Sequence, residues 1–89
     1  MAYRVELTPE AARDLRKLDR PVATRVRRFL AERVATAEDP RSSGGPLLGV
    51  PYWRYRVGDH RILVEIRDDA VLVLVVEIGH RSEIYIRKR

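Results

Sequence analysis

The residues best suited to chemistry in this sequence surround one predicted turn, in the stretch "WRYRVGDHRI" at positions 53–62. If Gly58 and Asp59 form a two-residue hairpin turn, Arg56 faces Arg61 on the next strand, with Arg54 at a diagonal. Like charges opposed in this way cost about 0.2–1 kcal/mol per pair. A bound anion would reverse the sign, and a planar guanidinium matches the geometry of phosphate. The stretch therefore predicts an anion-binding surface.

A third chain segment is expected at the same end of the sheet. The strand after "RDDA" (residues 67–70) should run antiparallel to the preceding one, so residues 79–83 return to the level of the Gly58–Asp59 turn. This brings Arg81 to the arginine surface, together with His80 and Tyr85. The alternative is an ordinary exposed sheet face whose arginines are paired with Glu65 or Glu77.

The first part of the chain reads as one strand and two helices. Apolar residues alternate with charged ones over 3–7, which predicts a half-buried strand. Thr8 and Pro9 then provide an N-cap and a first-turn proline. Apolar residues at helical spacing continue to Leu18, and after a break at 19–21 a second helix is expected over 22–37, closed by Pro40. Short connections predict a helical hairpin.

The second part of the chain reads as a loop followed by three strands. Residues 39–51 have the composition of a loop, with Leu47 and Leu48 expected to tuck under the core. Strands are predicted at 52–57, 60–66 and 71–78, and their short connections require an antiparallel meander. The last strand is apolar at almost every position, as in a central strand covered on both faces. We therefore predict one α+β domain spanning residues 1–89, with the helices on one sheet face.

Composition excludes several classes of function. The 89 residues carry a net charge of +5, which favours phosphate-rich or acidic protein partners. There is no cysteine, so disulfide and thiolate chemistry are excluded. His60 and His80 are the two histidines, and no carboxylate-rich spacing surrounds them, so we expect neither a metal nor another cofactor. The longest apolar run, 70–76, is too short to cross a bilayer, and we expect a cytoplasmic protein with no membrane partner.

Three stretches together resemble the RelE/ParE superfamily of bacterial toxins from type II toxin–antitoxin pairs. They are "YRVELTPEAARDLRKL", "YRVGDHRILVEI" and "VLVLVVEIGHRSEIY", which span Tyr3 to Tyr85 in the family's order. RelE-like members are endoribonucleases, or mRNA interferases, that cut mRNA in the ribosomal A site and so inhibit translation. ParE-like members inhibit DNA gyrase and lack the nuclease residues. The resemblance implies a toxin of the first kind, with the second as the alternative.

The resemblance also implies a set of site residues. The RelE-like catalytic and RNA-phosphate-binding positions correspond to Arg54, Arg56, Arg61 and Arg81, with Tyr85 nearby, and the four arginines match the surface predicted from register. Such cleavage needs a base for the 2′-hydroxyl, a cation for the phosphorane and an acid for the leaving oxygen. Arginine rarely gives up its proton, and it stands at both positions where the family often has lysine.

The candidates for proton transfer therefore lie elsewhere. They are His80, His60, Tyr85 and Glu77. His80 adjoins Arg81, and an imidazole suits acid–base work, whereas the alternative is an exposed loop histidine that only makes hydrogen bonds. His60 is expected on the face that the helices cover.

The resemblance further implies the partners. These are a cognate RelB-like antitoxin that folds on binding and covers the arginines, together with the ribosome and mRNA. Operator DNA would be contacted only through the antitoxin, because the charged helix at 22–37 lacks a helix-turn-helix context. A third possibility is a catalytically silent nucleic-acid or antitoxin-binding module that serves autoregulation.

Overall fold

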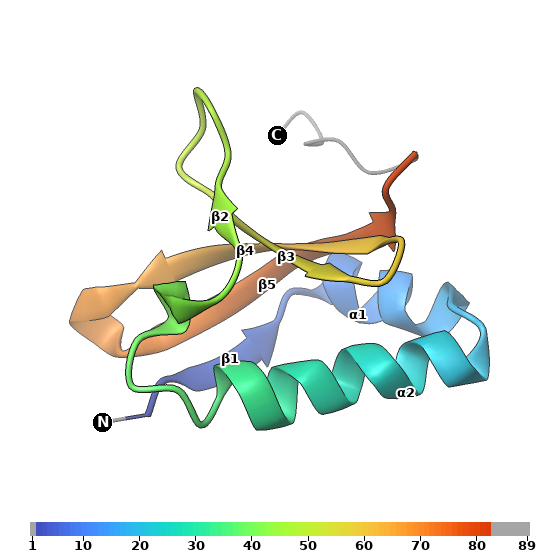
Figure 1. Ribbon diagram of the computed structural model, residues 1–89, viewed down its shortest axis with the longest axis horizontal. Helices are drawn as coiled ribbons and strands as arrows, with labels where there is room; N and C mark the ends of the chain where they lie inside the picture. The colour runs from blue at the N-terminus through green and yellow to red at the C-terminus, as the bar shows by residue number, and fades with distance from the viewer. Residues whose placement is uncertain (1, 83–89) are drawn as a thin grey trace.

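The computed structural model describes residues 2–82, which form a five-stranded sheet with two helices packed on one face (Figure 1). The strands are β1 (Arg4–Leu7), β2 (Gly45–Pro46), β3 (Trp53–Val57), β4 (His60–Arg67) and β5 (Leu72–His80). The helices are α1 (Pro9–Lys17) and α2 (Arg20–Phe29), and short 3₁₀ turns lie at Pro40–Ser42 and Asp68–Ala70. The predicted α+β class is confirmed.

Local sequence signals account for where both helices begin. The Thr8 hydroxyl oxygen accepts a hydrogen bond from the Ala11 N–H at 3.1 Å, so Thr8 is the N-cap of α1. Asp19 precedes α2, and Pro21 lies in its first turn. The end of α2 differs from the prediction of one helix to residue 37, because it continues as a π-helical turn over Leu30–Val34.

The sheet has the order β1-β5-β4-β3-β2. The predicted antiparallel meander β3-β4-β5 is confirmed, and β5 is a central strand as expected. The place of β1 was not predicted: it pairs in parallel with β5, and Arg4 lies opposite Leu72. A parallel pair needs a long crossover, and the two helices provide part of it. Among the described residues, no helix is long and apolar enough to cross a bilayer.

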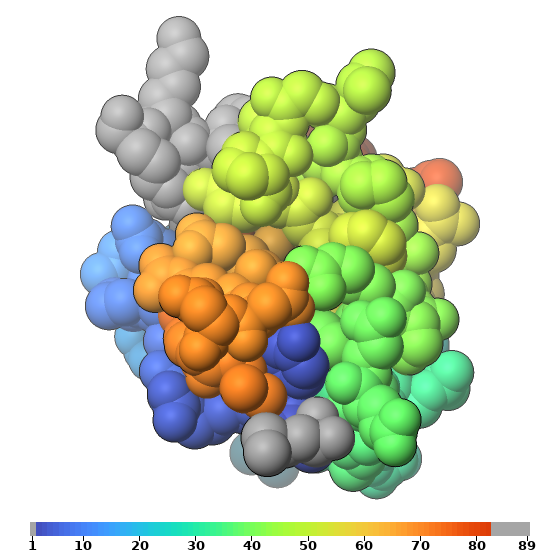
Figure 2. Space-filling model, turned by 90° about the vertical axis from the view of Figure 1, so that its left-hand side faces the viewer, coloured from blue at the N-terminus to red at the C-terminus, as the bar shows by residue number. Residues whose placement is uncertain are grey.

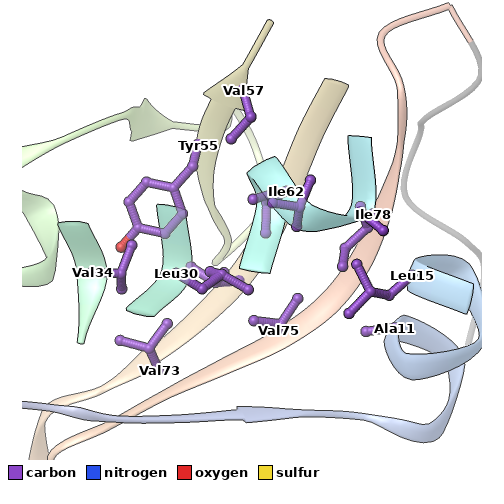
Figure 3. Close-up of a cluster of buried hydrophobic side chains, with 13 residues drawn as sticks. Ala11, Leu15, Leu30, Val34, Tyr55, Val57, Ile62, Val73, Val75 and Ile78 are labelled. Atoms are coloured by element: carbon purple, nitrogen blue, oxygen red, sulfur yellow. The ribbon is translucent and has the colours of Figure 1, made fainter. Parts of the chain in front are cut away.

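The core lies between the helices and one face of the sheet (Figure 3). Its fully buried members come from every layer and include Ala11, Val26, Tyr55, Ile62, Val64, Val73 and Val75. The rings of Phe29 and Tyr55 lie 5.5 Å apart at a tilted angle. The opposite face of β3, β4 and β5 carries arginines together with buried apolar residues such as Leu63 and Leu72.

The segment between α2 and β3 corrects one prediction. Leu48 is fully exposed and Leu47 is half-buried, so the expectation that both tuck under the core was wrong. Two side chains of β3 bind the first part of this segment. The Tyr55 hydroxyl donates to the Pro40 carbonyl at 2.6 Å, and the Trp53 Nε1–H donates to the Ser43 carbonyl at 2.7 Å. The yellow-green residues that follow β2 stand out from the body (Figures 1 and 2).

Candidate functional site

The sheet face turned away from the helices carries the predicted arginines, and we call it the arginine face. Arg56 lies directly opposite Arg61 across β3 and β4, and Arg54 lies opposite Leu63. Side chains of directly opposed residues share a face, with Cβ atoms about 5 Å apart. The register predicted from the Gly58–Asp59 turn is confirmed at every pair from Val57–His60 to Trp53–Val64.

Arg61 is at the centre of this positive charge. It is half-buried, and its Nη1 atom is buried with no hydrogen-bond partner among residues 2–82. Burial lowers the pKa of Arg61, and the positive charges of three other arginines lower it further. In order of decreasing effect, these are Arg56, Arg54 and Arg81. A free donor in such surroundings favours an anionic ligand.

Arg81 reaches the cluster from the residues that follow β5. Its backbone N–H donates to the Asp59 carbonyl at 2.7 Å, which holds this segment against the β3–β4 turn. The side chain is exposed, and its charge is among those that act on Arg61. The structure therefore brings Arg54, Arg56, Arg61 and Arg81 together from three chain segments.

The described part of the chain provides no ion pair between these four arginines and a carboxylate. The alternative would pair Glu65 or Glu77 with them. Glu65 contacts Arg67 instead, and Glu77 lies buried on the same face. Arginines clustered on a sheet face with no ion pair among residues 2–82 are the arrangement expected of an anion-binding site.

His80 does not join the cluster, and the expectation that it lies beside the arginines is corrected here. It pairs directly with His60, which in turn lies opposite Val57. Val57 belongs to the core, so both histidines lie on the helix side of the sheet. Their rings meet edge to face at 5.5 Å, and the His80 Nδ1 lies 2.7 Å from the Ser82 Oγ.

Glu77 lies on the arginine face instead. It is opposite Leu63, which is itself opposite Arg54, and its side chain is only 5% exposed. A β-bulge causes this arrangement: the β4–β5 register shifts between Leu63 and Val64, so that Val76 has no direct partner. Without the bulge, the alternation of sides would place Ile78 on the arginine face and Glu77 in the core.

Tyr85 lies outside the described residues. Within residues 2–82 there is no group of three or more potential metal ligands.

Comparison with known proteins shows the family of this chain. A family model described as "ParE toxin of type II toxin-antitoxin system, parDE" matches residues 5–85. The mRNA interferase toxin RelE of Escherichia coli K12 is 30% identical over 90 residues, covering 96% of this chain and 92% of that protein. The chain belongs to the RelE/ParE toxin superfamily.

Solved structures of the superfamily have the same fold. The toxin–antitoxin complex RelBE2 from Mycobacterium tuberculosis matches with a TM-score of 0.83 and 28% identity, covering 93% of this chain and 95% of that one. The E. coli RelBE complex matches with a TM-score of 0.74 and 23% identity, covering 89% and 96%. The superfamily assignment made from sequence is thus confirmed. The RelE-like and ParE-like branches of the superfamily are expected to differ in activity, so the residues of the site are the basis for choosing between them.

Proposed function

We propose that this toxin is a RelE-like mRNA interferase, a ribosome-dependent endoribonuclease that cuts mRNA in the A site and so stops translation. The observation that carries the proposal is the cluster of four arginines on the arginine face, which has no carboxylate partner among the described residues. The similarity to E. coli RelE supports it. This activity requires the cytoplasm, where ribosomes and mRNA meet.

The chemistry that suits this site is attack by a ribose 2′-hydroxyl on the adjacent phosphorus. The bond from phosphorus to the 5′-oxygen breaks, which leaves a 2′,3′-cyclic phosphate on one fragment and a 5′-hydroxyl on the other. Negative charge grows on the non-bridging oxygens in the transition state. We assign the donor to those oxygens to Arg61, because the positive charges of the other three arginines surround it. Arg54, Arg56 and Arg81 hold the flanking strand.

The 2′-hydroxyl must lose its proton, and a protonated guanidinium cannot accept it. Glu77 is the candidate that the β-bulge places on the arginine face, whereas His60 and His80 lie on the other side of the sheet. We therefore assign the base to Glu77 and give His60 and His80 no direct part in the reaction. A role for Tyr85 as the acid stays a prediction.

The protein partner is inferred from the net charge of the chain and from the solved structures of its relatives. The chain has a net charge of +5, and both solved relatives described above are complexes with an antitoxin. A RelB-like antitoxin that folds on this toxin would neutralise it by covering the arginine face with carboxylates. Contact with operator DNA would then come from the antitoxin, with the toxin as co-repressor.

The test is induction of the toxin alone in bacteria, followed by primer extension on an abundant translated message. We expect new message ends that disappear when translation is blocked. Arg61→Ala should abolish them. Arg16→Ala, which removes the same charge from an exposed position on α1, should leave them intact. Intact messages in growth-arrested cells would overturn the proposal.

A second candidate function is inhibition of DNA gyrase, because the family model that matches the chain bears the ParE name. Purified toxin would then block supercoiling by gyrase without cutting messages. We expect no such block. If neither growth arrest nor either activity occurs, the chain is a silent binding module instead.

A further inference from the structure

A small pocket opens beside the arginine face, between the start of β2 and the middle of β3. Its volume is about 210 Å³, and it is lined by Gly44, Gly45, Arg54 and Arg56. We call it the glycine pocket. Two of its lining residues are thus arginines of the proposed catalytic cluster, and the other two offer only backbone.

The glycine pocket exists because β2 has a glycine, Gly45, at a position where any other residue would place a side chain on the arginine face. Gly45 lies directly opposite Arg54, so a side chain at position 45 would stand on the arginine face next to that guanidinium. A Cβ atom at Gly45 would meet no atom within 4 Å. The space beside Arg54 therefore results from the glycine at position 45 and not from loose packing of neighbouring side chains.

The wall of the pocket is held firmly. Gly44 has a φ of +79°, and a Cβ there would lie 2.2 Å from the Arg54 carbonyl oxygen, so only glycine allows this close approach to β3. The hydrogen bonds from Trp53 to Ser43 and from Tyr55 to Pro40 fasten the preceding residues. A preformed wall lets a ligand bind without ordering the loop.

Charge and size define the occupant. Among the described residues no carboxylate lines the pocket and two arginines do, so an anion is the ligand that fits its charge. The volume lies below the usual range for a whole small-molecule ligand, about 300–1,000 Å³, and suits a phosphodiester with part of its ribose. Because Arg54 and Arg56 belong to both sites, one strand running across the arginine face would put its next phosphate here.

We propose that the glycine pocket binds a second phosphate of the RNA strand, adjacent to the phosphate that is cut. This inference rests on the proposed function, since it deepens the substrate binding of that same site. It gives Gly44 and Gly45 a role in holding the substrate that their lack of side chains makes possible.

The test measures binding of uncleavable RNA, so that it does not depend on catalysis. Affinities of 2′-O-methyl dinucleotides and trinucleotides, with one and two internucleotide phosphates, are measured by nuclear magnetic resonance titration. The parent should bind the trinucleotide at least about tenfold more tightly, as expected for one additional charge-assisted contact. The amide signals of Gly44 and Gly45 should shift with the trinucleotide only.

Matched variants identify the pocket as the cause. Gly45→Asp fills the pocket and places a carboxylate beside Arg54, so it should abolish the advantage of the trinucleotide. The isosteric Gly45→Asn fills the same space without the charge and should reduce the advantage less. Ser42→Asp makes the same charge change at an exposed position outside the pocket and should behave as the parent. Amide spectra of each variant confirm that it is folded.

The outcomes separate this inference from the proposed function. If the parent shows no trinucleotide advantage, or if Gly45→Asp keeps it, the pocket is not a phosphate site, whatever the cleavage assay shows. If Gly45→Asp impairs only the binding of an acidic probe such as polyglutamate, the pocket serves a protein partner and the inference is overturned. If the advantage is found but messages stay intact, the phosphate site stands and the nuclease proposal falls.

Discussion

At the scale of single residues, the opposed arginines of the arginine face lower the folding stability of the free protein and favour binding of an anion. Arg56 and Arg61 face each other, and neither forms an ion pair with a carboxylate among the described residues. Opposed like charges are destabilising in a sheet, and salt screens them where they are exposed. The free protein should therefore gain stability when one of the charges is removed.

We predict that Arg56→Thr raises the free energy of unfolding by about 0.2–1 kcal/mol, since it removes one of the opposed charges and introduces a good strand former. Urea denaturation at low and high salt would measure this, with the larger gain at low salt. Arg4→Thr is the matched control on β1, where the arginine pairs with Glu6 at 2.7 Å, and no gain is expected there. Equal effects at both positions would contradict the account.

Proton transfer gives a second prediction at this scale. Glu77→Gln keeps the shape of the side chain but removes its basicity, so we expect the rate of message cleavage to fall by about 10²–10⁴-fold, as for loss of a general base. RNA affinity should not fall with it. His80→Gln should change the rate only slightly, because His80 lies on the helix side of the sheet. If His80→Gln lowered the cleavage rate more than Glu77→Gln does, His80 and not Glu77 would be the base.

At the scale of elements, the pieces set by short-range signals could be predicted from sequence. One turn with glycine first determines the whole β3–β4 register, and with it the three arginines of these strands. The N-cap at Thr8 and the break before α2 are local in the same sense. The antiparallel return of the last strand predicted the place of Arg81, and the RelE/ParE resemblance implied the same residue.

Features that depend on tertiary contacts were not predictable in this way. No residue type marks the bulge at Val76, yet it decides that Glu77 and not Ile78 joins the arginine face. The two-residue strand β2 exists because Trp53 and Tyr55 anchor the segment before it, and such anchors are invisible without the fold. The glycine pocket was missed for that reason, although "GG" at 44–45 was a signal for it.

Tyr55→Phe tests the anchoring of this segment. The variant leaves the buried Pro40 carbonyl without its donor, which should cost about 1–3 kcal/mol in the free energy of unfolding. Tyr52→Phe is the matched control, since the Tyr52 hydroxyl makes no hydrogen bond within the described residues. Hydrogen exchange should show faster opening at residues 41–45 in Tyr55→Phe alone. Unchanged exchange there would show that the anchor does not hold the glycine pocket.

At the scale of the whole molecule, Asp68 joins three distant segments. It accepts a hydrogen bond from the Tyr3 hydroxyl at 2.6 Å and a bidentate pair from Arg41, both contacts at 3.0 Å. The hydrogen bond from Arg41, followed by that from Tyr3, lowers the pKa of Asp68. A carboxyl with a lowered pKa in the folded state adds stability above its unfolded pKa of about 4.

Asp68→Asn should therefore be less stable than the parent at neutral pH. The difference should shrink as the pH falls below about 4 and through the lowered pKa of the folded state, because the parent's carboxylate is then protonated. Thermal unfolding at a series of pH values would measure it. Asp69→Asn serves as the neighbouring control, since Asp69 forms no ion pair within residues 2–82. A difference that is independent of pH would show that the ion pair is not the cause.

The arrangement of the molecule as a whole separates folding from function. Helices and core occupy one side of the sheet (Figures 1 and 3). The arginine cluster lies on the other side, so exposed residues of that face can be changed without changing a core side chain. The central claim is that this face stabilises the attack of a 2′-hydroxyl on its neighbouring phosphate.

The most direct test is cleavage by purified toxin of an mRNA held on ribosomes, comparing an all-ribose A-site codon with one that carries a single 2′-deoxy substitution at the nucleotide 5′ of the cut. We predict a cut in the first message that leaves a 2′,3′-cyclic phosphate, no cut at that position in the second, and loss of cleavage with Arg61→Ala. Cleavage that survives the 2′-deoxy substitution, or an all-ribose message left intact, would contradict the claim.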